Sequence, residues 1–159
     1  MQTFTDKKGN RWNIELNVGS AKKVKAECGI DLFDTIQVAD EKISETVFEK
    51  LSADPALLVD VIFSLCRFPA TQCGLDAEKF AELFTGEVIE SASDALVEEI
   101  INFSPPIRRK ALTHFYQMTK NLMGKMEEEV ETLLKNFDDL PEIGKQSGNS
   151  STDTPGSAE

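Results

Sequence analysis

The side chains in this chain that are best suited to chemistry are one histidine and three cysteines. His114 lies in a stretch with helical spacing, and no sequence motif frames a serine or cysteine nucleophile that it could activate. Cys28, Cys66 and Cys73 are odd in number and contain no CxxC pair, so the ligand spacing of a metal site is missing. We therefore expect reduced thiols packed in the core.

Acidic side chains are numerous, but they are scattered over the surfaces of predicted helices. No pair of carboxylates is set apart for general acid–base catalysis. The segment GSAKK does not match the phosphate-binding loop pattern and opens no βαβ unit. The sequence therefore predicts a protein that is not an enzyme and that uses no metal or cofactor.

Charge and hydropathy restrict the class of partner. A length of 159 residues suits one domain with a real core, and the net charge of −11 offers no basic surface for phosphates. We expect no nucleic-acid partner and no membrane docking. No leader peptide is evident, and the apolar runs fall well short of the about 20 residues that cross a bilayer. These features predict a cytoplasmic protein.

The methionines are concentrated in one place. Apart from the first residue, all of them lie in the stretch QMTKNLMGKM, as Met118, Met123 and Met126. Unbranched, polarizable side chains fill gaps in irregular cores, and they also suit surfaces that bind apolar segments of varied sequence. Both interpretations stay open from the residues alone.

The elements that must position these side chains begin with a predicted β-hairpin over about residues 1–17. Trp12, Ile14 and Leu16 alternate with polar residues after the turn-rich DKKGN. Because two short strands are marginal in water, the hairpin must pack against helices.

Helical spacing follows in VGSAKKVKAEC, where Gly29 supplies the stop, and again over about 41–52. Asp54 and Pro55 then mark the start of a helix that is apolar on nearly all sides. Such a helix belongs in the middle of a bundle, and we expect Pro69 to end it.

Two further helices are predicted before the C-terminal helix. Asp76 is expected to cap a short helix, AEKFAELF, that Gly86 closes. A helix over 87–103 follows, and Ser104 is the expected N-cap of a last helix over about 106–137.

The last predicted helix carries an apolar stripe with spacings of three and four from Ile107 to Phe137. It would be about 48 Å long, whereas a body of about 140 residues is roughly 37 Å across. We therefore expect this helix to bend or to overhang the body. An overhanging stripe either binds a partner or is buried by a second copy of the chain. The candidate partner-binding residues are Met118, Leu122, Met123, Met126, Val130, Leu133, Leu134 and Phe137.

Charge also differs along the chain. Residues 106–137 carry six basic and four acidic groups, whereas residues 1–105 carry ten basic and 19 acidic groups. We expect the basic run 108–110 to lie against the acidic body, and the acidic run 127–131 to form a solvated face beside the stripe.

These patterns predict a mainly α fold: a compact helical bundle with a small N-terminal β-hairpin and a long C-terminal helix. We expect a single domain over 1–137. The Ser/Thr/Gly-rich remainder, 138–159, cannot bury enough apolar surface to fold and is predicted to be a disordered polar tail.

The order of segments over about residues 10–110 resembles that of tail assembly chaperones from long-tailed phages and prophages. The resemblance rests on a pattern of helix starts and apolar positions: a Trp-bearing hairpin strand, then VGSAKKVKAECGIDLFD, LSADPALLVDVIFSLC, GLDAEKFAELFTG and ALVEEIINFSPP.

The resemblance implies a protein that binds the long helical tape measure protein, keeps it soluble and helps recruit tail tube subunits. Alternatives are a structural phage component, such as a head–tail connector or minor tail protein, and a helical adaptor that forms a homo-oligomer through its long helix. The family offers no sharp functional motif, so the candidate residues come from the helix alone.

Overall fold

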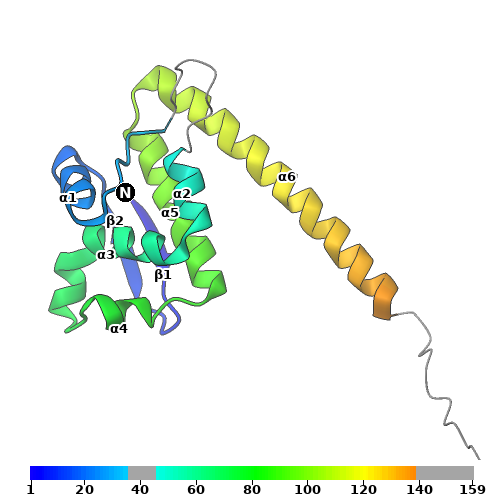
Figure 1. Cartoon of the computed structure of the whole chain (residues 1–159), viewed down its shortest axis with the longest axis horizontal. Helices are drawn as coiled ribbons and strands as arrows, with labels where there is room; N and C mark the ends of the chain where they lie inside the picture. The colour runs from blue at the N-terminus through cyan, green and yellow to red at the C-terminus, as the bar shows by residue number, and fades with distance from the viewer. Residues whose placement is uncertain (36–45, 139–159) are drawn as a thin grey trace, which may run out of the picture. The chain divides into compact units, whose positions relative to one another are not determined.

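The computed structural model describes residues 1–35 and 46–138, which form a mainly α-helical fold with one N-terminal β-hairpin, as predicted (Figure 1). Its elements in chain order are β1 (Gln2–Thr5), β2 (Arg11–Ile14), α1 (Val18–Cys28), α2 (Val47–Ala53), α3 (Pro55–Gln72), α4 (Ala77–Ala81), α5 (Gly86–Phe103) and α6 (Pro106–Asp138).

Contacts divide the chain into two units, Met1–Tyr116 and Gln117–Glu159, and the division falls inside α6. The single domain over 1–137 stays a prediction. The predicted disordered tail lies, apart from Asp138, outside the described residues.

The hairpin forms where alternation predicted it. β1 and β2 pair antiparallel, from Gln2 opposite Ile14 to Thr5 opposite Arg11. Trp12, Ile14 and Leu16 are all buried, so the alternating face does pack inward.

Asp6 holds the hairpin turn together. Its carboxylate accepts hydrogen bonds from the backbone N–H groups of Lys8 and Asn10, from Asn10 Nδ2 and from Trp12 Nε1, all at 2.8–2.9 Å. Burial alone would raise the pKa of Asp6, but the bonds from Trp12 and Asn10 hold it below the usual value. The carboxylate is therefore held ionised in a buried position.

The helices of the first unit surround the hairpin (Figure 1). β1 packs against α5, and β2 packs against α3, which also contacts α1, α2, α4 and α5. The prediction that α3 is central is thus confirmed. Phe80 of α4 joins the hairpin to α3, because its ring lies 5.0 Å from that of Trp12 and 5.4 Å from that of Phe63.

Several helix boundaries follow the predicted signals. Gly29 ends α1 in the left-handed conformation, with φ of 72°. The Asp54 side chain caps α3 by accepting from Leu57 N. α2 begins later than expected, at Val47 after a capping box at Thr46, and the predicted helical residues 41–45 lie outside the described ranges.

The prediction that Pro69 ends α3 is wrong. α3 continues to Gln72 because Ala70 is fully buried and a later stop signal takes over. The N–H groups of Gly74 and Leu75 donate to the carbonyls of Thr71 and Ala70, both at 3.0 Å, which is the Schellman pattern.

Gly86 does not close α4, contrary to the prediction. The short helix α4 ends at Ala81, and Gly86 is the first residue of α5. Ser104 was also misassigned: its hydroxyl donates to the Ile100 carbonyl at 2.9 Å and thereby closes α5 instead of capping α6.

The first turns of α6 belong to the first unit, and they pack by a face other than the predicted stripe. Leu112 is buried, and the Tyr116 hydroxyl donates to Asp94 of α5 at 2.6 Å. Ile107 is 88% exposed and Phe115 63% exposed. Within the basic run, the Arg109 guanidinium donates to the Ser104 carbonyl, where we had expected an acidic surface.

Candidate interaction surface on α6

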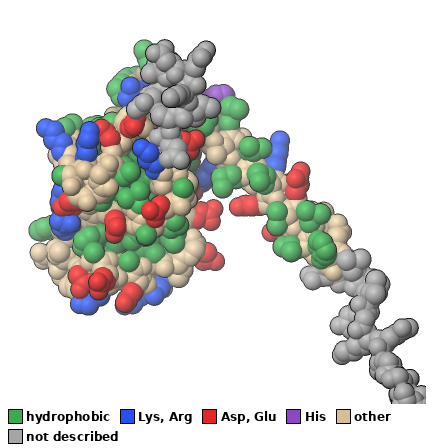
Figure 2. Space-filling view, viewed as in Figure 1, with side chains coloured by type: hydrophobic (Ala, Val, Ile, Leu, Met, Phe, Trp, Pro, Cys, Tyr) green, Lys and Arg blue, Asp and Glu red, His purple; other side chains and the backbone are tan. Residues whose placement is uncertain are grey.

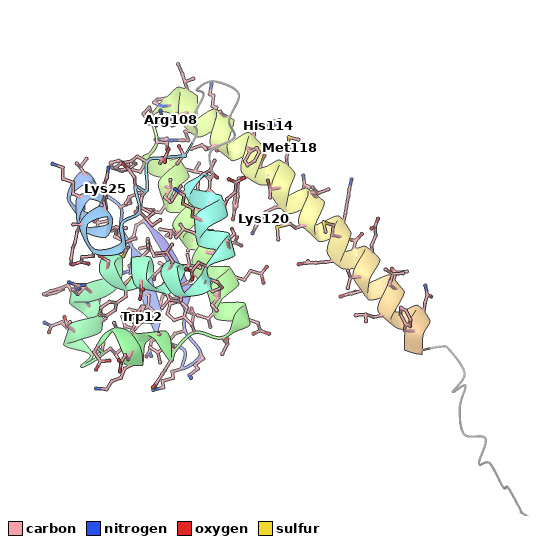
Figure 3. All side chains as sticks on the ribbon, viewed as in Figure 1. Trp12, Lys25, Arg108, His114, Met118 and Lys120 are labelled. Carbon is pink, nitrogen blue, oxygen red and sulfur yellow. The ribbon has the colours of Figure 1, made fainter. Side chains whose placement is uncertain are left out.

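The eight candidate residues all lie on α6 within the second unit and all are exposed. Their exposed fractions range from 52% for Val130 to 68% for Phe137. We call this set the α6 stripe: Met118 (labelled in Figure 3), Leu122, Met123, Met126, Val130, Leu133, Leu134 and Phe137.

The second unit offers no cover for this stripe among its described residues, since all of them, 117–138, belong to α6. Figure 2 shows hydrophobic side chains gathered on this part of the helix, with acidic side chains beside them. In proteins most helical stability comes from packing of an amphipathic face, so the stripe is the face through which this helix would gain stability.

The spacing keeps the stripe on one face. Leu122 and Leu133, Met123 and Leu134, and Met126 and Phe137 are each eleven residues apart. Eleven residues make three turns at about 3.67 residues per turn, close to the natural period of a helix. From Met118 to Phe137 the stripe runs for about 29 Å, which is long enough to pair with another helix along its length.

A shallow depression lies within the stripe. It has a volume of about 410 Å³ and is lined by Met123, Met126 and Val130, with Glu127 and Glu131 on its border. Because all five lining residues come from one helix, it is an open surface feature between side chains and not an enclosed cavity. It can accept an apolar side chain from a partner helix, with the two carboxylates left in water.

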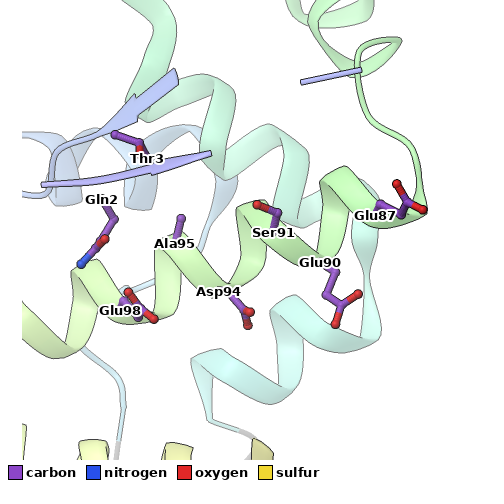
Figure 4. Close-up of a pocket in the computed structure, with 8 residues that line it drawn as sticks. All are labelled: Gln2, Thr3, Glu87, Glu90, Ser91, Asp94, Ala95 and Glu98. Carbon is purple, nitrogen blue, oxygen red and sulfur yellow. The ribbon is translucent and has the colours of Figure 1, made fainter. Parts of the chain in front are cut away.

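A second depression, of about 380 Å³, lies between β1 and α5 (Figure 4). Carboxylates at Glu87, Glu90, Asp94 and Glu98 recur at spacings of three and four and line it from one face of α5. This groove was not predicted from the sequence, although the carboxylate spacing of three and four could have indicated an acidic helix face. Its other lining residues are Gln2, Thr3, Ser91 and Ala95.

The three thiols have different surroundings. Burial raises the pKa of Cys66 to about 12, and burial with Asp60 and Glu27 nearby also raises the pKa of the half-buried Cys28. Both are therefore protonated and inert at neutral pH. Cys73 is exposed, so the prediction of a packed thiol is wrong at that position.

One buried carboxylate was not anticipated. Glu99 of α5 is 5% exposed and accepts from the Leu16 backbone N–H at 3.2 Å. The amino group of Met1 lies 2.9 Å from its other oxygen. These contacts tie the start of β1 and the end of the hairpin to α5, which is a structural role.

His114 is exposed on α6. Within residues 1–35 and 46–138, no group of three or more His, Cys, Asp or Glu side chains could hold a metal ion. Over the same part of the chain, no helix has the length and apolar character needed to cross a membrane.

The α6 stripe is therefore the strongest candidate for a functional surface. Comparison with known proteins adds no relative: no family model matches the chain, and no curated protein or solved structure is significantly similar to it.

Proposed function

We propose that this chain is a phage tail assembly chaperone that binds apolar helical segments of the tape measure protein through the α6 stripe. The observation that carries the proposal is the row of eight apolar side chains, each more than half exposed, on one face of a single helix. The order of segments over residues 10–110, which resembles such chaperones, supplies the identity of the partner.

The chemistry of the stripe suits a long helical partner. Its length of about 29 Å favours side-by-side packing with a helix. Three of its eight residues are methionines, whose flexible thioethers adapt to successive apolar segments of different sequence. The net charge of −11 keeps the complex soluble while the apolar faces are joined.

The expected affinity is moderate. Complete burial of a Leu, Met or Phe side chain contributes about 1.5–3 kcal/mol, so eight half-exposed residues give a gross gain on the order of 10 kcal/mol. Association costs about 4–15 kcal/mol in lost freedom, and the net affinity is therefore modest. A chaperone needs reversible binding, because the tape measure protein must later be released. The release would take place in the host cytoplasm, where this protein would also help recruit the tail tube subunits.

Co-expression tests the proposal. The tape measure protein from the same gene cluster is expressed alone, with this chain, and with an unrelated acidic protein of similar size. We expect a several-fold increase in soluble tape measure protein, and its copurification, only with this chain. Unchanged solubility together with no copurification would contradict the proposal.

Mass spectrometry of purified virions separates the chaperone from a structural tail component. A chaperone leaves before the tail is complete, so we expect no peptides of this chain in the particle. Stoichiometric amounts there would instead identify a connector or minor tail protein.

A further inference from the structure

In the C-terminal half of α6, the two edges of the α6 stripe carry different charge. Glu127 and Glu131 lie four residues apart on one edge, so they are neighbours on the helix surface. Both carboxylates are exposed, and both border the depression within the stripe. The opposite edge carries Lys125 and Glu129, whose opposite charges are also four residues apart and offset each other. We call Glu127 and Glu131 the acidic edge of the stripe.

The acidic edge has no ion-pair partner within the part of the chain that the structure describes. None of the ion pairs found there involves Glu127 or Glu131. Lys135 lies four positions after Glu131, but no residue three or four positions from Glu127 is a Lys or an Arg. Like charges four residues apart repel each other on a helix. A positive charge brought by another molecule would relieve this repulsion.

A helix that packs on the α6 stripe brings its own edge residues beside the acidic edge. Its apolar side chains would fill the depression between Met123, Met126 and Val130, and the two carboxylates would border the contact. Lys or Arg suits this border, because the long apolar stem covers the stripe while the charged end reaches a carboxylate. Asp or Glu at the same positions would be repelled by the acidic edge.

We propose that the α6 stripe selects apolar helical segments that carry Lys or Arg along an edge of their apolar row. This inference rests on the proposed function and adds to it the kind of tape measure segment that is bound: amphipathic helices with a basic edge, and not those with an acidic edge. The net charge of −11 acts in the same direction, because it attracts basic segments before contact. The apolar row supplies the contact area, and the acidic edge supplies the choice among segments.

Synthetic helical peptides test this selection with the full chain. Two peptides of about 20 residues, which matches the length of the stripe, share one apolar row and carry either Lys or Glu on both of its edges. We expect the Kd measured by fluorescence anisotropy to be about tenfold lower for the Lys peptide, because attraction at the acidic edge replaces repulsion. The preference should shrink as the salt concentration rises.

Two double variants with the same net charge locate the effect. Glu127→Gln combined with Glu131→Gln removes the acidic edge and should reduce the preference to less than about threefold. The matched control, Glu87→Gln combined with Glu90→Gln, changes two exposed carboxylates of α5 in the first unit and should leave the preference near its wild-type value. Circular dichroism checks that both variants remain helical.

Three results would overturn the inference. One is equal affinity for the two peptides, or binding of neither. Another is an equal loss of preference in both double variants, which would assign the preference to net charge alone. The third is a free chain of twice 17.6 kDa that excludes both peptides, which would make a second copy the occupant. Equal affinity with copurification of the tape measure protein retained would reject the acidic edge and leave the proposed function standing, so the two failures are distinguishable.

Discussion

At the scale of single residues, Asp6 shows how one charge can organise a small β element. Four donors converge on its buried carboxylate, and two of them, from Trp12 and Asn10, come from side chains. Asp6→Asn would direct an amide group at these donors. We expect the free energy of unfolding to fall by about 1–3 kcal/mol, measured by urea denaturation with the single tryptophan as the reporter.

The matched control for that change is Asp60→Asn on the exposed side of α3, which should alter stability by less than about 0.5 kcal/mol. Equal effects of the two substitutions would show that the Asp6 hydrogen bonds contribute nothing specific.

Asp6 should also make stability depend on pH. The folded pKa of Asp6 lies below its ordinary value, so the contribution of Asp6 to stability is complete above the unfolded pKa and is lost as pH falls through the folded pKa. The stability difference between the wild type and Asp6→Asn should therefore shrink as pH is lowered below about 4. A difference that stays constant down to pH 2 would contradict this assignment.

At the scale of elements, the junction between α5 and α6 rests on Tyr116. Burial and the hydrogen bond to Asp94 raise the pKa of this tyrosine, which is the only one in the chain. Absorbance at 295 nm should therefore show ionisation of the folded protein well above pH 10, and a midpoint near 10 after unfolding in urea. A midpoint near 10 in the native protein would mean that the first turns of α6 are not docked on α5.

The helices also show which signals can be read from sequence. The starts and stops at Asp54 and Gly29 were predicted because each depends on a local capping bond. The prediction that Pro69 ends α3 was wrong because tertiary packing extends the helix past the proline. The prediction for Gly86 was wrong because a glycine can begin a helix as well as end one. Local chemistry sets these ends only where packing does not override it.

The faces of α6 were harder to predict than its length. The sequence indicated a helix over 106–137, and the structure gives Pro106–Asp138. The sequence could not show that Leu112 and Tyr116 are the α6 residues that pack inside the first unit, because Ile107 and Phe115 have equally good helical spacing. Which face packs depends on the surface of α5, and that surface exists only after folding.

At the scale of the whole molecule, the proposed function depends on the α6 stripe being a surface that binds another protein. The sequence predicted the eight residues because the apolar period continues to Phe137, and the structure leaves every one of them exposed. The sequence could not show whether the three methionines of the stripe pack in a core or form an interface. The described part of the second unit, all of it in α6, contains no second element in which they could be core.

The most direct measurement compares two triple variants in the co-expression assay. One changes Met118, Met123 and Met126 to Ser on the stripe, and the other changes Gln117, Asn121 and Glu128 to Ser on the polar face of the same helix. We expect the stripe variant to fold normally, to lose most copurified tape measure protein and to leave it insoluble, while the polar-face variant behaves as wild type. Equal recovery of the partner with both variants would contradict this expectation.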